Sequence, residues 1–224
     1  MKGRALKKKI LGLLQDSGLD GVLALLDEFP GRQLVNPLVG CLCSSDEMVK
    51  WLAVSALGRA VAKLADQEME EARVVMRRFM WMLNDESGGI GWGVPEAMGE
   101  VMACHAGLAE EYAHILVANM REEGNFLELE MLQRGLMWGL GRLCGARPQL
   151  MQAKNAGLYL PFYLDSADPE VRGRAVWALG RLGDRTALAK LKARIDDQSP
   201  VTIYLEGKIQ HFTIGELVAE VLAK

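Results

Sequence analysis

Apolar side chains recur along most of the chain three or four residues apart, which is the spacing of an amphipathic helix. In one segment, Val171, Ala175 and Leu179 fall on a single stripe, with charged residues on the other faces. Four such segments share a core in which an apolar residue is followed by Gly and a charged residue. Each is preceded by another apolar segment, most clearly residues 72–83. The pattern predicts a series of antiparallel helix pairs.

The glycines of the shared core recur at a nearly constant interval. They lie 41, 42 and 39 residues apart, at Gly58, Gly99, Gly141 and Gly180. A self-similar period of about 40 residues is typical of a two-helix solenoid. Gly in an exposed helix costs about 1 kcal/mol relative to Ala, so close packing must offset that cost. We therefore expect neighbouring helices to approach closely at these positions.

The periodicity also suggests how the chain is divided. Residues 1–31 are interpreted as an N-terminal helical cap, because a stacked array must cover its apolar end. Residues 32–183 hold four helix-pair repeats, and residues 184–224 form a terminal repeat. We expect a single all-α domain, a right-handed α-α superhelix of about five helix pairs.

Two insertions interrupt the turns inside helix pairs. Residues 200–212 alternate apolar and polar side chains around Glu206-Gly207, which predicts a β-hairpin. Thr213 and Glu216 then have the spacing of a capping box for the last helix. The other insertion is the glycine-rich stretch before Val94. Since both insertions occupy equivalent turns, we expect both to project from one edge of the solenoid.

Two segments carry a more specific signature. Residues 160–184, LPFYLDSADPEVRGRAVWALGRLGD, resemble a HEAT repeat, in particular the short form named after phycobilisome lyases. The resemblance lies in Pro161, the helix-capping Asp168, Val171-Arg172, Ala175 and Ala178-Leu179-Gly180. Residues 36–61 are similar, with Asp46 as the cap and Lys50 in place of the Arg.

Residues 67–104 and 108–144 keep the Gly core but lack the Asp-x-x-Val-Arg element, so the resemblance covers about residues 32–224. It implies a HEAT-like solenoid. It also implies a binding scaffold, because most HEAT arrays bind other molecules and only some are enzymes. The fold alone does not say which molecule is bound.

Charge and composition narrow the class of function. A net charge of −3 and a pI near 5.7 argue against a general nucleic-acid binder. The apolar run Ile10–Leu14 is too short for a signal peptide or a membrane span, so we expect a cytoplasmic protein. The four cysteines are interpreted as free thiols. No His or Cys spacing indicates a metal, and no cofactor is expected.

Tryptophan and arginine recur on the second helices of two repeats. Trp138 and Trp177 occupy matching positions, and Arg142 and Arg181 follow four residues later. Arg174 lies on the same side of its helix, within about 60° of Trp177. Such a stripe on the concave surface has the composition of a binding hot spot. Alternatively, the indoles pack between repeats with arginine stems over them.

The second repeat has carboxylates where the others have aromatic or basic residues. Glu96 and Glu100 lie one helical turn apart, next to Trp92, and could form an acid–base pair. The alternation of charge along Arg59, Glu100 and Arg142 instead favours a structural ladder of ion pairs. The turn at residues 88–93 could form an anion-binding nest, or it could be a surface turn that anchors Trp92.

The leading hypothesis is a non-catalytic scaffold that binds an unidentified protein partner. We expect contacts from the concave face and the adjacent turn: Trp92, Trp138, Arg142, Arg174, Trp177 and Arg181. The alternative is a phycobilin-lyase-like or cofactor-handling enzyme subunit, with Glu96 or Glu100 as the catalytic group. A third possibility, disfavoured by the acidity of the chain, is recognition of DNA lesions, as in HEAT-like glycosylases.

Overall fold

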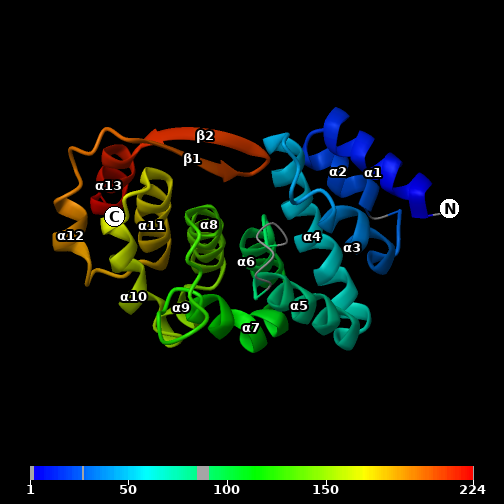
Figure 1. Cartoon of the computed structure of the whole chain (residues 1–224), viewed down its shortest axis with the longest axis horizontal. Helices are drawn as coiled ribbons and strands as arrows, with labels where there is room; N and C mark the ends of the chain where they lie inside the picture. The colour runs from blue at the N-terminus through cyan, green and yellow to red at the C-terminus, as the bar shows by residue number, and fades with distance from the viewer. Residues whose placement is uncertain (1–2, 27, 85–90, 224) are drawn as a thin grey trace.

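The computed structural model describes residues 3–26, 28–84 and 91–223, and these fold into a row of antiparallel helix pairs (Figure 1). The first three pairs are α3 (Gly31–Val39) with α4 (Glu47–Gln67), α5 (Met69–Leu83) with α6 (Val94–Cys104), and α7 (Ala106–Ala118) with α8 (Glu130–Ala146). In the next pair, three short helices precede the second helix: α9 (Pro148–Ala153), α10 (Ala156–Tyr159) and the 3-10 helix η1 (Leu160–Asp165), followed by α11 (Pro169–Leu182). The row ends with α12 (Leu188–Lys192) and α13 (Ile214–Leu222). The predicted helical solenoid is confirmed.

Two helices cover the N-terminal end of the row. α1 (Gly3–Asp16) and α2 (Leu19–Leu26) pack against α3 and α4. Leu6, Ile10 and Leu14 are buried there, on the stripe that helical periodicity predicts. None of the described helices is long and apolar enough to cross a membrane.

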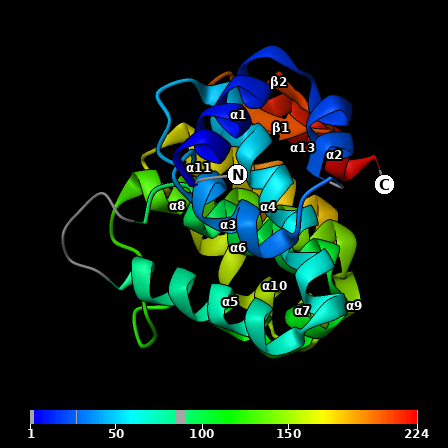
Figure 2. The ribbon, with the colours of Figure 1, turned by 90° about the vertical axis from the view of Figure 1, so that its right-hand side faces the viewer.

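The second helices form the central layer of the molecule. α4, α6, α8, α11 and α13 pack against one another in that order. In Figures 1 and 2, α5, α7 and α9 lie on one side of this layer, and the strands lie on the other. The apolar residues between the helix layers form a continuous core.

Two second helices meet backbone to backbone at glycines. A Cβ atom on Gly99 of α6 would lie 2.4 Å from the Cα of Gly139 in α8 and 2.5 Å from its carbonyl oxygen. These are backbone atoms, so the two helices would have to separate to admit any side chain. The close approach predicted for the repeated Gly is therefore confirmed at Gly99.

The predicted hairpin is present as β1 (Pro200–Leu205) and β2 (Lys208–Thr213). The strands pair antiparallel, with Val201 opposite Phe212 and Leu205 opposite Lys208. Both turn residues have positive φ, 50° at Glu206 and 82° at Gly207, as a two-residue type I′ turn requires. Thr213 and Glu216 form the predicted capping box at the start of α13.

Two aspartates begin second helices, as predicted, but in different surroundings. Asp168 accepts hydrogen bonds from the backbone N–H groups of Glu170 and Val171, at 2.8 and 3.3 Å. Its other oxygen pairs with Arg134 at 2.6 Å, and its side chain is 2% exposed. Asp46 accepts a bond from the N–H of Val49 at 3.2 Å and is exposed.

This difference predicts unequal costs for the same substitution. Asp168→Ala should lower the free energy of unfolding by about 2 kcal/mol, since it removes a cap and leaves Arg134 without its carboxylate. Asp46→Ala should cost about 1 kcal/mol or less, because only a solvent-exposed cap is lost. Urea titration of both variants measures the difference. Equal losses would show that the Arg134 pair adds nothing.

Candidate functional site

Four aromatic rings gather where the hairpin crosses the second helices. Tyr204 of β1 stacks on Trp51 of α4, with ring centroids 5.1 Å apart and an interplanar angle of 3°. Trp138 of α8 lies 4.7 Å from Trp51, and Trp177 of α11 lies 6.4 Å from Trp138. Such pairs stabilise beyond the area they bury. Three helices and one strand therefore share a single aromatic cluster.

Polar side chains of the helices hold β1 against this cluster. The indole N–H of Trp138 donates to the carbonyl oxygen of Tyr204 at 3.0 Å. Arg174 donates to the carbonyl oxygen of Thr202 at 3.1 Å, and Glu170 accepts from the N–H of Thr202 at 3.0 Å. By the strand register, these backbone groups face away from β2. Helix side chains thus form hydrogen bonds with backbone groups at the edge of β1 that would otherwise have no partner strand.

The expectation that the hairpin projects from an edge of the solenoid is wrong. It lies across the second helices, as Figure 1 shows, and its tip packs against Leu19 of α2. The reason is the apolar surface it carries: Val201, Ile203 and Tyr204 are all nearly inaccessible to solvent. A projecting hairpin would expose these side chains to water, at a cost of about 1.5–3 kcal/mol for each large apolar one.

The hairpin determines where the predicted contact residues lie. Trp138, Trp177 and Arg174 are only 1%, 8% and 5% exposed. The ring of Trp177 also fills the space above Gly141, where a Cβ atom would lie 2.3 Å from the ring. Packing of the indoles between repeats, which the sequence left open, is the arrangement found.

An open cavity of about 540 Å³ remains on the concave face beside the hairpin. Its helix wall carries Arg59, Arg142 and Arg181, from α4, α8 and α11. The opposite wall includes hairpin residues and the side of α2. Trp138 and Trp177 reach its lining from the aromatic cluster. The cavity wall therefore carries guanidinium groups above packed aromatic rings.

One arginine of the cavity is held by a carboxylate. Glu100 of α6 accepts two hydrogen bonds from Arg142, at 2.6 and 3.2 Å. The Glu100 side chain is 10% exposed and that of Arg142 is 33% exposed. This pair confirms the Glu100–Arg142 step of the predicted ladder and fixes Arg142 in the wall.

Arg181 is placed differently. It is exposed, and no residue in the described part of the chain forms an ion pair or hydrogen bond with it. Its guanidinium lies against Gly145 of α8, where a Cβ atom would come within 2.4 Å of Nε. The absence of a side chain at Gly145 therefore lets Arg181 lie along the cavity wall with its donors available.

Glu96 and Glu100 belong to separate ion pairs. Glu96 is 3% exposed and pairs with Lys50 at 2.8 Å, and the same ammonium lies 4.5 Å from the centroid of Trp51. Because Glu100 is engaged with Arg142, the two carboxylates do not face each other as an acid and its base. Their geometry fits structural ion pairs.

The thiol of Cys104 opens onto the same cavity. It donates a hydrogen bond to Glu100 at 3.5 Å. Burial, together with the negative charge of Glu100, raises the pKa of Cys104 to about 12. The thiolate is therefore scarce near neutral pH, and Cys104 is poorly suited to act as a nucleophile.

Trp92 lies apart from the cluster, just before α6. Its side chain is 44% exposed. The turn at residues 88–93 falls partly outside the described residues; within the described part, Gly93 has φ of 74° and its Cα faces the carbonyl of Leu42. The structure thus places Trp92 at the surface, next to a tightly packed turn.

Sequence reasoning missed Trp51 and Tyr204 as members of the site. Tyr204 alternates with the apolar residues Ile203 and Leu205, and this alternation by itself predicts a place on the polar face of the hairpin. Its hydroxyl lies 3.1 Å from that of Ser55, which is 149 residues away in the chain. The hairpin carries a large aromatic residue on each face, and this is the signal that could have indicated that other parts of the chain pack against both faces.

Comparison with known proteins agrees with this geometry. The HEAT repeats family model matches residues 159–204. The designed armadillo repeat protein YIII(Dq)4CqI superposes with a TM-score of 0.54 at 16% identity, over 96% of this chain and 98% of its own. Another, YIII(Dq.V1)4CPAF in complex with peptide (KR)4, has a TM-score of 0.55 at 17% identity, over 96% and 97%. No curated protein matches the chain.

These identities are too low to carry a function, and they establish the fold. The chain has the fold of an armadillo-like α-solenoid, its residues 159–204 match the HEAT repeats family model, and it ends in a two-stranded hairpin followed by a helix.

Proposed function

We propose that the protein is a non-catalytic scaffold that binds a segment of a protein partner in the concave cavity. The observation that carries this proposal is Arg181, an exposed guanidinium on the cavity wall without a partner among the described residues. Trp138 and Trp177 supply buried aromatic surface under the same wall. Arginine is enriched among the residues that contribute most of the binding energy at protein interfaces.

The charges of the cavity favour an acidic partner segment. Arginine binds carboxylates through two parallel hydrogen bonds, and Arg181 has donors to offer. The designed protein in complex with the peptide (KR)4 supports a peptide as the class of ligand; that peptide is basic, whereas the cavity of this chain favours an acidic one. We propose that the partner of this chain places a carboxylate against Arg181.

Trp92 is a second point of contact in this proposal. Its exposed ring offers apolar area outside the cavity, and large exposed aromatic residues are common at interfaces. A partner that occupies the cavity and also reaches the surface before α6 would cover it.

The same geometry favours binding over a lyase-like role. A catalytic Glu96 would have to leave Lys50, and a catalytic Glu100 would have to leave Arg142. The lyase-like alternative predicts a chromophore bound to the purified protein and an activity lost in Glu96→Gln.

The proposal predicts that Arg181→Glu weakens partner binding at least tenfold, because it sets two carboxylates against each other. The protein is immobilised, partners are captured from native lysate and identified by mass spectrometry, and the affinity of the captured partner is then titrated. Arg185→Glu is the matched control, since Arg185 is exposed and lies outside the cavity lining.

A partner retained by Arg185→Glu and lost by Arg181→Glu supports the cavity as the binding site. If both variants retain the same partners with equal affinity, binding occurs elsewhere on the molecule and the proposal fails.

A further inference from the structure

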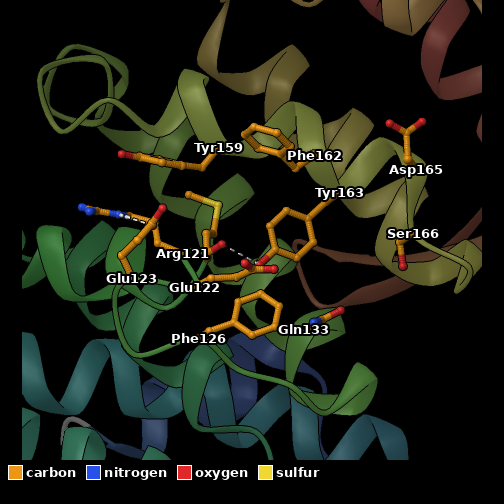
Figure 3. A pocket seen from close by; sticks show the side chains of 11 residues that line it. Arg121, Glu122, Glu123, Phe126, Gln133, Tyr159, Phe162, Tyr163, Asp165 and Ser166 are labelled. Atoms are coloured by element: carbon orange, nitrogen blue, oxygen red, sulfur yellow. Dashed lines mark hydrogen bonds and ion pairs between the residues drawn. The ribbon is translucent and has the colours of Figure 1, made fainter.

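A second cavity, of about 520 Å³, lies away from the concave face (Figure 3). It opens between the segment that follows α7 and the end of η1, and it shares no lining residue with the concave cavity. Four aromatic residues line it: Phe126, Tyr159, Phe162 and Tyr163. We call this cavity the aromatic pocket.

The rings are held in place by the two segments that meet here. Tyr163 is 6% exposed, and its hydroxyl donates to the carbonyl oxygen of Met120 at 3.2 Å. Phe126 and Tyr159 are half-buried, and Phe162 is 68% exposed at the rim. The pocket therefore has fixed inner rings and one open aromatic edge.

Cations of the chain already lie over two of these rings. The guanidinium carbon of Arg121 is 5.2 Å from the centroid of Tyr159, and the ammonium of Lys190 is 5.7 Å from that of Phe162. Both distances are within the range of a cation–π interaction. The faces of these rings thus accommodate positive charge.

One carboxylate of the pocket takes part in none of its ion pairs. Asp165 is neutralised by Lys190 and Arg194, at 3.0 and 2.9 Å, and Glu123 lies 3.8 Å from Arg121. Glu122 has no cationic partner among the described residues. In the view of Figure 3, its side chain lies between Phe126 and Tyr163. The carboxylates disfavour an anion and favour a cation.

The chemistry of the lining restricts the kind of cation. Primary ammonium and guanidinium groups carry three and five N–H donors that need acceptors. The four aromatic rings that line the pocket offer π faces rather than strong hydrogen-bond acceptors. A quaternary ammonium has no N–H group, so it needs only ring faces and a nearby carboxylate.

We propose that the aromatic pocket binds a trimethylammonium group, with Phe126, Tyr159 and Tyr163 as the ring faces and Glu122 as the counter-charge. The group belongs either to a trimethylated lysine side chain or to a small free cation. This proposal is independent of the concave cavity and of the partner proposed to bind there.

The test compares choline with 3,3-dimethyl-1-butanol, an uncharged molecule of the same shape, on the full chain. Amide chemical shifts are followed by NMR during titration. Choline should shift resonances of residues 120–126 and 159–166, and the neutral analogue should bind at least about fivefold more weakly, as a loss of about 1 kcal/mol implies. Equal binding of the two molecules, or no shift in either segment, overturns the proposal.

Variants then assign the residues. Phe126→Leu and Tyr159→Leu keep apolar bulk but remove the π face, so each should reduce the preference for choline over the neutral analogue. Glu122→Gln should weaken choline binding several-fold, whereas Glu128→Gln, an exposed carboxylate outside the pocket, should not. Equal effects of these two substitutions would contradict a counter-charge at Glu122. The wild-type comparison stands even if a ring variant folds poorly.

A third arm identifies the source of the group. A short peptide with trimethyllysine that binds more tightly than choline supports a protein ligand, and equal affinities support a free small cation. Binding of the unmethylated lysine peptide as tightly as the trimethylated one would overturn the choice of a quaternary ammonium.

Discussion

Tyr204→Ala is expected to lower the free energy of unfolding by about 4 kcal/mol, as removal of a buried aromatic side chain usually does. Tyr204 is 3% exposed, stacks on Trp51 and lies 6.3 Å from Trp138. Its loss leaves a cavity between the hairpin and α4, and nothing nearby is placed to fill it. Guanidinium chloride unfolding measures the loss, and tryptophan emission should shift to longer wavelength as Trp51 becomes hydrated.

Tyr204→Phe is the matched control. It removes only the hydroxyl contact with Ser55 and keeps the ring stack, so it should cost about 1 kcal/mol. If Tyr204→Ala costs no more than Tyr204→Phe, the ring is not packed as described and the hairpin is held by its backbone contacts alone.

The second large effect is expected at Gly99. Gly99→Ala should lower the free energy of unfolding by about 3 kcal/mol, because the new methyl group would meet the backbone of Gly139 and force α6 and α8 apart. The gain in helix propensity, about 1 kcal/mol, opposes this loss but does not cancel it.

Gly12→Ala provides the same chemical change without the contact. Gly12 lies inside α1, and a Cβ atom there would have nothing within 4 Å. We expect that variant to gain about 0.5–1 kcal/mol. Thermal unfolding shows directly whether each variant is more or less stable than the wild type. If Gly99→Ala leaves the stability unchanged, the close contact between α6 and α8 is refuted.

Local signals made most of the fold predictable. The interval between Gly58, Gly99, Gly141 and Gly180 reports the repeat, since each copy must pack on the next in the same way. The caps at Asp46 and Asp168 and the turn at Glu206-Gly207 are confirmed, because each depends on only a few neighbouring residues.

The position of the hairpin was not predictable in the same way. Its place depends on contacts such as that of Trp138 with Tyr204, 66 residues apart in the chain. Neither residue carries a local mark of this contact, because a Trp on a helix fits a solvent-facing hot spot and a buried cluster equally well. Helical periodicity leaves open whether the tryptophans face solvent or pack between repeats, and only the long-range contacts with the hairpin bury them.

The aromatic pocket escaped prediction for another reason. Periodicity indicated one first helix before Asp168, whereas the chain forms α9, α10 and η1 there. The break falls at Asn155, which has φ of 61°, a conformation that ends a helix. The three short helices turn Tyr159 and Tyr163 toward the segment after α7, an arrangement that a continuous helix would not produce.

The hairpin determines which side chains of the concave face are accessible. It covers the Trp138 and Trp177 rings and leaves Arg142 and Arg181 at the edge of an open cavity. The central claim is therefore that β1 seals the aromatic cluster in the folded protein and leaves the arginines of the cavity accessible.

Exchange of the tryptophan indole N–H groups with solvent deuterium, followed by NMR on the wild-type chain, tests this claim most directly. The indole of Trp138 donates to the carbonyl oxygen of Tyr204, whereas Trp81 and Trp92 are 64% and 44% exposed. We predict that the Trp138 indole exchanges at least about a hundredfold more slowly than those of Trp81 and Trp92, since exchange requires the hairpin to open. Exchange of Trp138 as fast as that of Trp92 would contradict the account, because the hairpin would then not cover the concave face in solution.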